Sequence, residues 1–284
     1  MSRRAGRPTA DTVGSGQPAH LPPPHRPAGA ETRGTTAPNR LRRLDRWLVA
    51  LHGARLRRAA DPLVVDLGYG RHPVTTVELH GRLAAEVRTD VDVLGVEIAR
   101  ERVDVAQPFA RPGLSFARGG FNLPVGTRRP VVVRAMNVLR QYDETAAAGA
   151  WAVLCAQLDA DGVLVEGTCD EIGRRAVWVA LDARGPRTLT FAARVDGLER
   201  PSDLAERLPK ALIHRNVPGE PVHALLRDWD RAWERSAGGA DASPRTRWVE
   251  AAGLLVASGR RVARNPARWR LGELTVAWQE VAPS

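Results

Sequence analysis

The residues best placed for chemistry lie where an apolar run ends in an acidic residue and two glycines follow at once. The stretch is Val64-Val65-Asp66-Leu67-Gly68-Tyr69-Gly70. Such β-branched runs are typical of a buried parallel strand, and the glycines permit a tight turn at which a ligand can approach the backbone. A dinucleotide-binding turn needs a third glycine in the pattern G-x-G-x-x-G. Pro73 occupies that position, after Arg71 and His72, so a pyrophosphate-binding turn is disfavoured.

A second set of polar residues follows the apolar run at residues 131–135. Arg134 and Asn137 lie at its end, and Tyr142 follows five residues later. Ligands of open α/β sheets bind beyond the carboxyl ends of the strands, and a buried arginine or asparagine without partners is costly. We therefore expect Arg134 and Asn137 to contact a ligand, with turn capping and a surface ion pair as the alternative. Tyr142 is a candidate on the substrate side.

Glu166 ends a further apolar run, at residues 163–165, and Asp170 and Glu171 follow it. On the same rim of the sheet, these acids could bind a cationic substrate or supply a general base. A solvated loop acid is the alternative. The catalytic role stays unassigned among four candidates: Arg134, Asn137, Tyr142 and Glu166.

The elements that position these residues alternate between strands and helices from Pro62 onward. This alternation predicts an α/β fold with a mostly parallel sheet covered on both faces. The predicted strands are 63–67, 92–97, 113–117, 131–135 and 163–166, and the predicted helices between them are 74–86, 99–107 and 144–158. An amphipathic helix precedes them over residues 39–60, with Asn39 as its N-cap.

The alternation breaks after Gly167. Two runs typical of strands, 176–181 and 188–193, predict a β-hairpin. Helices are predicted near 202–209, near 221–235 and from Ser243-Pro244 onward. The stretches 260–264 and 273–281 predict an antiparallel hairpin at the sheet edge.

The turn from Asp66 to Gly70 resembles motif I of the class I S-adenosylmethionine (SAM) dependent methyltransferases. Glu97, which ends the second strand, stands where that family has an acid that hydrogen-bonds both ribose hydroxyls. Residues 119–122, Gly-Gly-Phe-Asn, resemble the family's turn beside the adenine, while bulky His72 replaces the third small residue of motif I. The resemblance implies SAM as cofactor and ten cofactor-binding residues: Asp66, Gly68, Tyr69, Gly70, Glu97, Ile98, Gly120, Phe121, Asn122 and Asn137.

The resemblance also implies a fold and a domain organisation. It covers residues 60–168 and 244–281, and it implies a Rossmann-like, mostly parallel seven-stranded sheet with helices on both faces. Residues 169–243 are then an inserted hairpin and helical lid in a SAM-binding domain of residues 61–284. The implied function is methyl transfer to an unidentified acceptor, for which a small molecule or a protein is favoured. The alternatives are an RNA methyltransferase and a non-catalytic SAM- or NAD-binding protein of the Rossmann fold.

The formal net charge of +10 is concentrated at one end of the chain. Residues 1–60 hold twelve arginines and three acidic residues, so the rest is almost neutral. Residues 1–38 are rich in Pro, Gly, Ala, Thr and Arg, and we expect them to form a disordered basic arm. Such an arm can attract RNA. The alternative is that the arginines of the arm have no partner and only reflect the use of arginine as the cation throughout this protein, since Lys210 is the only lysine.

Three arginines in the first turn of the predicted N-terminal helix, Arg40, Arg42 and Arg43, oppose the helix dipole. Their placement favours an anionic partner, with a solvated helix face as the alternative.

Other function classes are disfavoured by composition. Two cysteines, Cys155 and Cys169, and seven scattered histidines provide no metal-ligand spacing, so no metal site is expected. No apolar run approaches the length of about 20 residues that a membrane helix needs, and no apolar segment follows Arg3 and Arg4 as in a secretory signal. We expect a cytoplasmic protein without a membrane partner. The sequence does not predict its oligomeric state.

Overall fold

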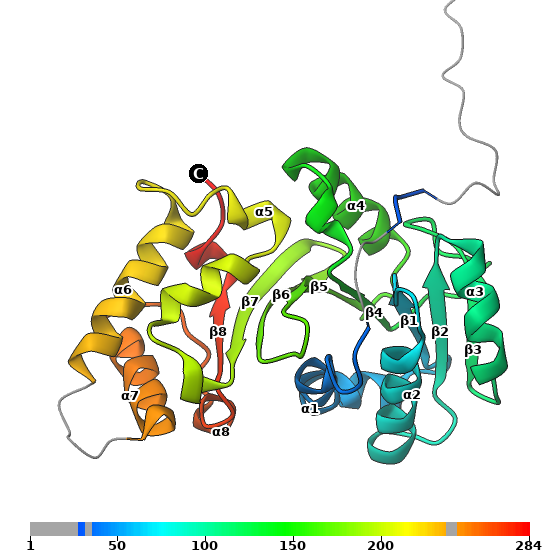
Figure 1. The fold of residues 1–284 in the computed structure, drawn as a ribbon, viewed down its shortest axis with the longest axis horizontal. Coiled ribbons are helices and arrows are strands. Elements are labelled where there is room, and N and C mark those ends of the chain that lie inside the picture. The colour runs from blue at the N-terminus through cyan, green and yellow to red at the C-terminus, as the bar shows by residue number, and fades with distance from the viewer. Residues whose placement is uncertain (1–27, 32–35, 237–242) are drawn as a thin grey trace, which may run out of the picture.

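A single sheet of eight strands runs through the described part of the chain, with helices on both faces (Figure 1). The computed structural model describes residues 28–31, 36–236 and 243–284. The strands are β1 (Leu63–Leu67), β2 (Asp92–Glu97), β3 (Leu114–Arg118), β4 (Val132–Met136), β5 (Val163–Cys169), β6 (Arg175–Asp182), β7 (Gly185–Ala193) and β8 (Glu273–Ala277).

The α-helices are α1 (Arg42–Arg58), α2 (Val74–Glu86), α3 (Arg100–Ala106), α4 (Glu144–Ala156), α5 (Lys210–Ile213), α6 (Pro221–Arg235), α7 (Pro244–Ala257) and α8 (Pro266–Trp269). Short 3₁₀ helices are η1 (Gln107–Phe109), η2 (Leu139–Gln141), η3 (Val195–Gly197), η4 (Pro201–Arg207) and η5 (Trp278–Glu280).

The sheet has two halves with different strand directions. The first five strands are parallel, in the order β3-β2-β1-β4-β5, and β6, β7 and β8 continue the sheet as antiparallel neighbours. The order reverses at β1, which lies between β2 and β4. This is the arrangement of doubly wound α/β folds, whose ligands bind outside the carboxyl ends of the strands at the reversal. The predicted Rossmann-like α/β fold is confirmed.

Alternate residues of the parallel strands enter two different cores, because successive side chains of a strand point to opposite faces. Val65 and Leu164 belong to the core covered by α4, α6 and α7. Val64 and Val165 belong to the core covered by α1, α2 and α3. Since both faces are buried, these strands are continuous apolar runs in the sequence.

The predicted hairpin over residues 176–193 is present, but it continues the main sheet. β6 pairs with β5, and β7 pairs with β8, so the sheet has eight strands rather than the expected seven. Residues 176–181 are buried throughout, as strands in a covered sheet must be, and this part of the expected insertion is not a lid. Of the hairpin expected at the C-terminal end, a single bridge forms between Val262 and Val276 beside β8.

The start of α1 differs from the prediction. The helix begins at Arg42 with Leu41 as N-cap, so the assignment of Asn39 as N-cap is wrong. Asn39 has a φ of 60°. Its N–H donates to Glu78 (2.8 Å), and its side-chain oxygen accepts from Arg82 (3.0 Å). Contacts with α2, about 40 positions away, therefore replace the local capping bond.

Most of the arm predicted to be disordered, residues 1–27 and 32–35, lies outside the described residues. Ala28–Glu31 are described, and they contact the carboxyl end of the sheet. Among the described residues, the helices are too short or too polar for a membrane crossing.

Candidate functional site

The carboxyl ends of β1, β2 and β3 and the loop after β4 converge on one pocket, at the point where the strand order reverses. Its walls combine residues from these loops with three residues of the N-terminal segment: Leu67, Gly68, Glu97, Ile98, Gly119, Gly120, Phe121, Val138, Tyr142, Ala28, Gly29 and Ala30. Half of the residues predicted to bind the cofactor line this pocket: Gly68, Glu97, Ile98, Gly120 and Phe121.

The glycine turn after β1 has a backbone conformation that glycine adopts readily and other residues rarely do. Gly68 and Gly70 have φ angles of 72° and 85°, in the left-handed region. Gly68 N–H donates to the carbonyl of Val96 (2.7 Å), and Gly70 N–H donates to Glu97 Oε2 (3.0 Å). The turn is thereby fixed against the end of β2.

Glu97 is the buried carboxylate of the pocket, with 1% of its surface exposed. Besides Gly70, its partners are the N–H groups of Ile98 and Ala99, 2.9 and 3.5 Å from Oε1, and the guanidinium of Arg102, 3.6 Å from Oε2. A carboxylate offers about four lone-pair sites. Four contacts already surround the carboxylate, but those of Ala99 and Arg102 are long, so a ligand hydroxyl can take their place with a shorter bond.

Tyr69, between the two glycines, turns its side chain toward α3. Its ring packs edge-on against Phe116, with centroids 5.5 Å apart, and its hydroxyl donates to the carbonyl of Arg102 (3.3 Å). Burial, with a smaller contribution from the charge of Glu97, raises the pKa of Tyr69. The backbone of Tyr69 is the part that remains near the turn, where its carbonyl accepts from the Thr36 hydroxyl (3.0 Å).

Residues Ala28–Ala30 lie within the pocket. Ala28 N–H donates to Asn122 Oδ1 (2.9 Å), and its carbonyl accepts from Phe121 N–H (2.8 Å). Ala30 N–H donates to the hydroxyl of Tyr142, and its carbonyl accepts from the side chain of Gln141 (2.9 Å). The remaining cavity has a volume of about 20 Å³, room for about one water molecule.

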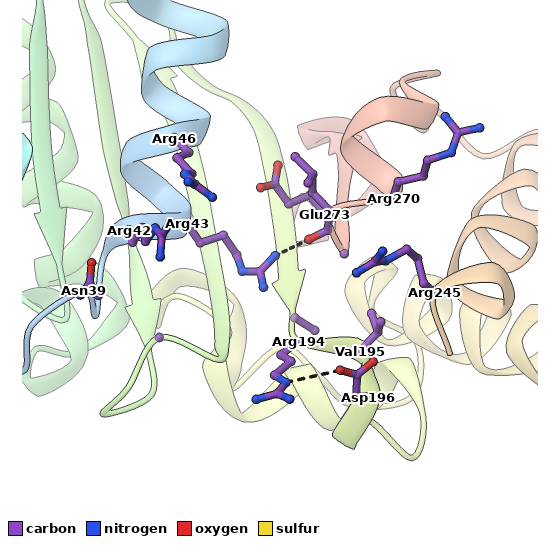
Figure 2. A pocket seen from close by; sticks show the side chains of 14 residues that line it. Asn39, Arg42, Arg43, Arg46, Arg194, Val195, Asp196, Arg245, Arg270 and Glu273 are labelled. Atoms are coloured by element: carbon purple, nitrogen blue, oxygen red, sulfur yellow. Dashed lines mark hydrogen bonds and ion pairs between the residues drawn. The ribbon is translucent and has the colours of Figure 1, made fainter. Parts of the chain in front are cut away.

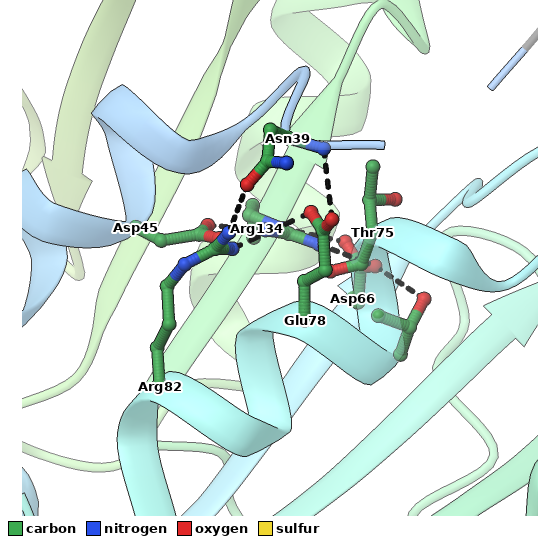
Figure 3. Close-up of polar contacts among 8 residues, drawn as sticks. Asn39, Asp45, Asp66, Thr75, Glu78, Arg82 and Arg134 are labelled. Atoms are coloured by element: carbon green, nitrogen blue, oxygen red, sulfur yellow. Dashed lines mark hydrogen bonds and ion pairs between the residues drawn. The ribbon is translucent and has the colours of Figure 1, made fainter. Parts of the chain in front are cut away.

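Asp66 and Arg134, both predicted to contact the ligand, form a buried ion pair that does not line the pocket (Figure 3). Arg134 Nε and Nη2 donate to the two oxygens of Asp66, at 2.8 and 2.7 Å. Nη2 also donates to the carbonyl of Thr75 (3.0 Å), and Nη1 donates to Asp45. The Thr76 hydroxyl donates to Asp66 Oδ2 (2.6 Å). These bonds join β1, β4, α1 and α2.

The charges of this network keep Arg134 ionised. Burial alone lowers the pKa of Arg134, but the carboxylates of Asp66 and Asp45 raise it above its ordinary value. Asp45 also accepts from Arg82 of α2, so two buried acids face two cations. The role that the structure shows for Asp66 and Arg134 is to hold the elements of the fold together.

Asn137 links the ends of β4 and β5. It has a φ of 61°, and its N–H donates to the carbonyl of Gly167 (2.7 Å). Its side chain accepts from Cys169 N–H (3.0 Å) and donates to Cys169 Sγ (3.2 Å). The amide group is thus bound within the fold, next to Val138, which lines the pocket.

Glu166 lies on the sheet face covered by α4. Trp151 Nε1 donates to its Oε2 (3.2 Å), and Oε1 has no hydrogen-bond partner among the described residues. Burial raises the pKa of Glu166 to about 8, although the bond from Trp151 opposes this shift. The carboxyl is therefore largely neutral at pH 7 and enclosed in the core. Among the four catalytic candidates, Tyr142 is the one that lines the pocket.

His72, the departure from the glycine pattern, is exposed and packs against Phe109, with ring centroids 5.0 Å apart. It does not line the pocket.

Comparisons with known proteins give structural likeness without sequence relatives. No family model matches the sequence, and no curated protein matches it. One similar structure is magnesium protoporphyrin IX methyltransferase from Synechocystis PCC 6803 with bound SAH, at 22% identity and a TM-score of 0.35, over 45% of this chain and 53% of that chain. Another is the CcbJ methyltransferase from Streptomyces caelestis, at 19% identity and a TM-score of 0.36, over 55% and 70% of the two chains.

A third similar structure is the [4+2]-cyclase SpnF, at 21% identity and a TM-score of 0.33, over 44% of each chain. The chain spans about half the length of the first of these proteins. Likenesses at these identities and TM-scores assign no activity. The fold follows from the strand order, and the function has to follow from the pocket.

Two parts of the site leave no periodic signal in the sequence. The contact of Ala28 with Asn122 joins positions 94 residues apart, and the bond from Arg134 to Asp45 joins positions 89 apart. Periodicity identifies strands and helices but carries no information on such contacts. The odd polar residue on an apolar helix face, Asp45 beside Leu44 and Trp47, is the one hint that the sequence offers.

Proposed function

We propose that this chain binds SAM in the pocket at the ends of β1, β2 and β3 and transfers its methyl group to an acceptor. The observation that carries the proposal is the convergence of three polar features on one pocket. These are the glycine turn at Gly68 and Gly70, the buried carboxylate of Glu97, and the pair formed by Phe121 N–H and Asn122 Oδ1. The resemblance of the sequence to class I methyltransferases supports the same assignment.

The residues of the pocket fit a nucleoside. Adenine presents a nitrogen acceptor beside its amino group, and Phe121 N–H and Asn122 Oδ1 supply the complementary donor and acceptor. Glu97 can accept from ribose hydroxyls. Gly120 leaves room for a flat group, because a Cβ there would overlap the position that the carbonyl of Ala28 now holds. Cofactor binding requires Ala28–Ala30 to leave, since the free volume beside them is about 20 Å³.

When bound, SAM supplies an electrophilic methyl group on a positively charged sulfur. The chain's own task is then to position the acceptor and to exclude water, because a positioned and desolvated nucleophile needs no strong base. Tyr142 is the candidate that can hydrogen-bond a ligand directly, since its hydroxyl faces the pocket. Arg134, Asn137 and Glu166 support the walls from within the fold. A small molecule or a protein is the proposed acceptor.

The test is titration calorimetry of the full chain with S-adenosylhomocysteine and, separately, with NAD. We expect the first to bind and the second not to bind. Glu97→Gln should weaken binding about tenfold or more, because a hydrogen bond to a charged group contributes about 1.5–3 kcal/mol. Glu101→Gln, a matched change at an exposed residue of α3, should leave the affinity unchanged. Binding of NAD without S-adenosylhomocysteine would favour the non-catalytic alternative and overturn the proposal.

A further inference from the structure

Six arginines surround a second pocket on the same edge of the sheet (Figure 2). β7 runs in the direction of β5, since both are antiparallel to β6, so its end lies on the carboxyl edge of the parallel strands. The pocket has a volume of about 610 Å³, within the range of about 300–1,000 Å³ that is usual for small-molecule sites. Its arginines come from α1, from the end of β7, and from α7 and the segment after α8: Arg42, Arg43, Arg46, Arg194, Arg245 and Arg270.

The positive charge of this pocket is only partly neutralised. Its two acidic residues are engaged: Asp196 pairs with Arg194 (3.4 Å), and Glu273 accepts from Arg268 (2.7 Å). Within the described part of the chain, five arginines of the wall make no ion pair: Arg42, Arg43, Arg46, Arg245 and Arg270. Like charges held around one cavity repel each other, so the cavity favours a negatively charged occupant.

Arg43 adds an unused donor. Its guanidinium donates to the carbonyl of Leu271, but its buried Nε has no hydrogen-bond partner among the described residues. Burial lowers the pKa of Arg43, and the nearby charge of Glu273 only partly offsets this. Buried donors are normally satisfied. Figure 2 shows the side chains of Arg43 and Arg245 directed toward each other from opposite walls.

The N-terminal end of α1 adds positive charge to this pocket. Its N-cap, Leu41, makes no side-chain capping bond, and the first turn of a helix carries a partial positive charge. Arg42 and Arg43 lie in that turn and add to this charge. Helix N-termini and arginines both favour anions. Of the three arginines expected in the first turn, Arg42 and Arg43 line the pocket, whereas Arg40 precedes the helix and donates to the carbonyls of Asp170 and Cys169.

We propose that this pocket binds a small molecule that carries two or more phosphate groups. Guanidinium groups form paired hydrogen bonds with phosphate oxygens, and arginines on opposite walls can engage more than one phosphate at a time. The proposal does not depend on the function of the first pocket, because the two pockets share no lining residue among those that the structure describes.

The test is titration calorimetry of the full chain with sodium tripolyphosphate at low, constant salt. We expect binding, and we expect the double variant Arg42→Gln/Arg46→Gln to weaken it about tenfold or more, since hydrogen bonds between charged groups are the strong ones. The control Arg57→Gln/Arg58→Gln makes the same charge change at the other end of α1 and should retain the affinity. Circular dichroism checks that both variants are folded.

Three results would overturn this proposal. The parent chain could fail to bind tripolyphosphate, or both double variants could lose the same affinity, as expected for a diffuse effect of net charge. Single-stranded RNA could bind through Arg42 and Arg46 where tripolyphosphate does not, which would assign the surface to a nucleic-acid backbone.

A separate observation concerns the first pocket and rests on its proposed function. We infer that Ala28–Glu31 is a built-in competitor of the cofactor. The carbonyl of Ala28 accepts from Phe121 N–H, and its N–H donates to Asn122 Oδ1, so Ala28 occupies the donor and the acceptor that we assign to adenine. Glu31 anchors the segment by an ion pair with Arg102, whose guanidinium also lies beside Glu97. The cofactor site is therefore complete only when this segment has left.

Substitutions in the segment test this inference in the full chain. A Cβ at Gly29 would lie 3.2 Å from the hydroxyl of Tyr142, and its φ is 135°. Gly29→Val should therefore displace the segment and tighten S-adenosylhomocysteine binding about tenfold or more, because a larger share of molecules is competent to bind. Glu31→Gln, which breaks a partly exposed ion pair, should tighten it about two- to fivefold. Glu101→Gln is the matched control and should have no effect.

Hydrogen exchange gives a second measurement. The N–H groups of Ala28 and Ala30 should be protected in the parent chain and should lose protection when S-adenosylhomocysteine binds. Equal affinity in the parent chain and Gly29→Val would overturn the competitor while leaving the proposed function intact. Absence of binding in every variant would instead overturn the proposed function, and the competitor with it.

Discussion

Arginine has opposite surroundings in two regions of this molecule. Arg134 is fully buried, and its three guanidinium nitrogens all have acceptors, on Asp66, on Asp45 and on the carbonyl of Thr75 (Figure 3). In the pocket at the start of α1, arginines from separate elements face a cavity with few acceptors (Figure 2). A buried charge persists only with partners. The first arrangement is therefore complete within the chain. The arginines of the second are mostly exposed, so solvent can hydrate them and an anionic ligand can still bind them.

The largest expected effect is on the complete network. Arg134→Met should lower the free energy of unfolding by about 3–5 kcal/mol, because Asp66 would remain buried without a cation and Asp45 would keep only Arg82. Urea denaturation measures this loss. Arg58→Met, at an exposed position of the same molecule, should change stability by less than about 0.5 kcal/mol. A loss no larger than that of the control would mean that the network does not hold the fold together.

Glu166 is a third case, a buried acid whose described partner is Trp151 and not a cation. The pKa of Glu166 is about 8 in the folded chain against an ordinary value of 4.5. Its neutral form therefore contributes stability that is fully present below pH 4.5 and is lost as the pH rises through about 8. Glu166→Gln should remove this dependence, so the variant gains about 3–5 kcal/mol relative to the parent at pH 9 as compared with pH 4. Urea denaturation across this range checks it. Parallel pH profiles of the two proteins would contradict it.

The smallest effect is expected in the arginine pocket. Arg42→Gln/Arg46→Gln should leave the unfolding free energy unchanged or raise it by up to about 1 kcal/mol, because positive charge is removed from a helix N-terminus. Thermal denaturation at low salt measures the gain, which should vanish at high salt. Added tripolyphosphate should raise the melting temperature of the parent chain and not that of the variant. A clear loss of stability in the variant would show that these arginines have partners within the fold.

Local elements could be predicted from the sequence because they depend on local pattern. The strand at 63–67 and the helix at 74–86 have the bounds that their apolar spacing predicts. The glycines at 68 and 70 have positive φ angles as a tight turn requires. The pairing of strands that lie far apart in the sequence follows no such local pattern. The hairpin at 176–193 was predicted, but nothing in its own residues indicates that β5 and β8 are its neighbours.

The candidate site could be predicted only in part, for the same reason: contacts between distant residues leave no local pattern. Gly68, Glu97 and Phe121 could be placed together because the ends of parallel strands meet at one edge of a sheet. Arg134 was expected at that edge too, but its side chain bonds to Asp45, and a strand-end position does not determine which face a long side chain takes. The occupation of the pocket by Ala28–Ala30 depends on matched hydrogen bonds, which composition alone cannot indicate.

The antiparallel half of the sheet leaves one strand edge unpaired while the chain is being synthesised. β7 pairs along its other edge with β8, which begins at Glu273, 80 positions after β7 ends. At synthesis rates of about 5–20 residues per second, that edge stays open for roughly ten seconds on the ribosome. Leu189 and Phe191, fully buried in the finished protein, lie along it. Open strand edges pair with other chains, so products that stop before Glu273 are expected to aggregate before any loss of ligand binding can be measured.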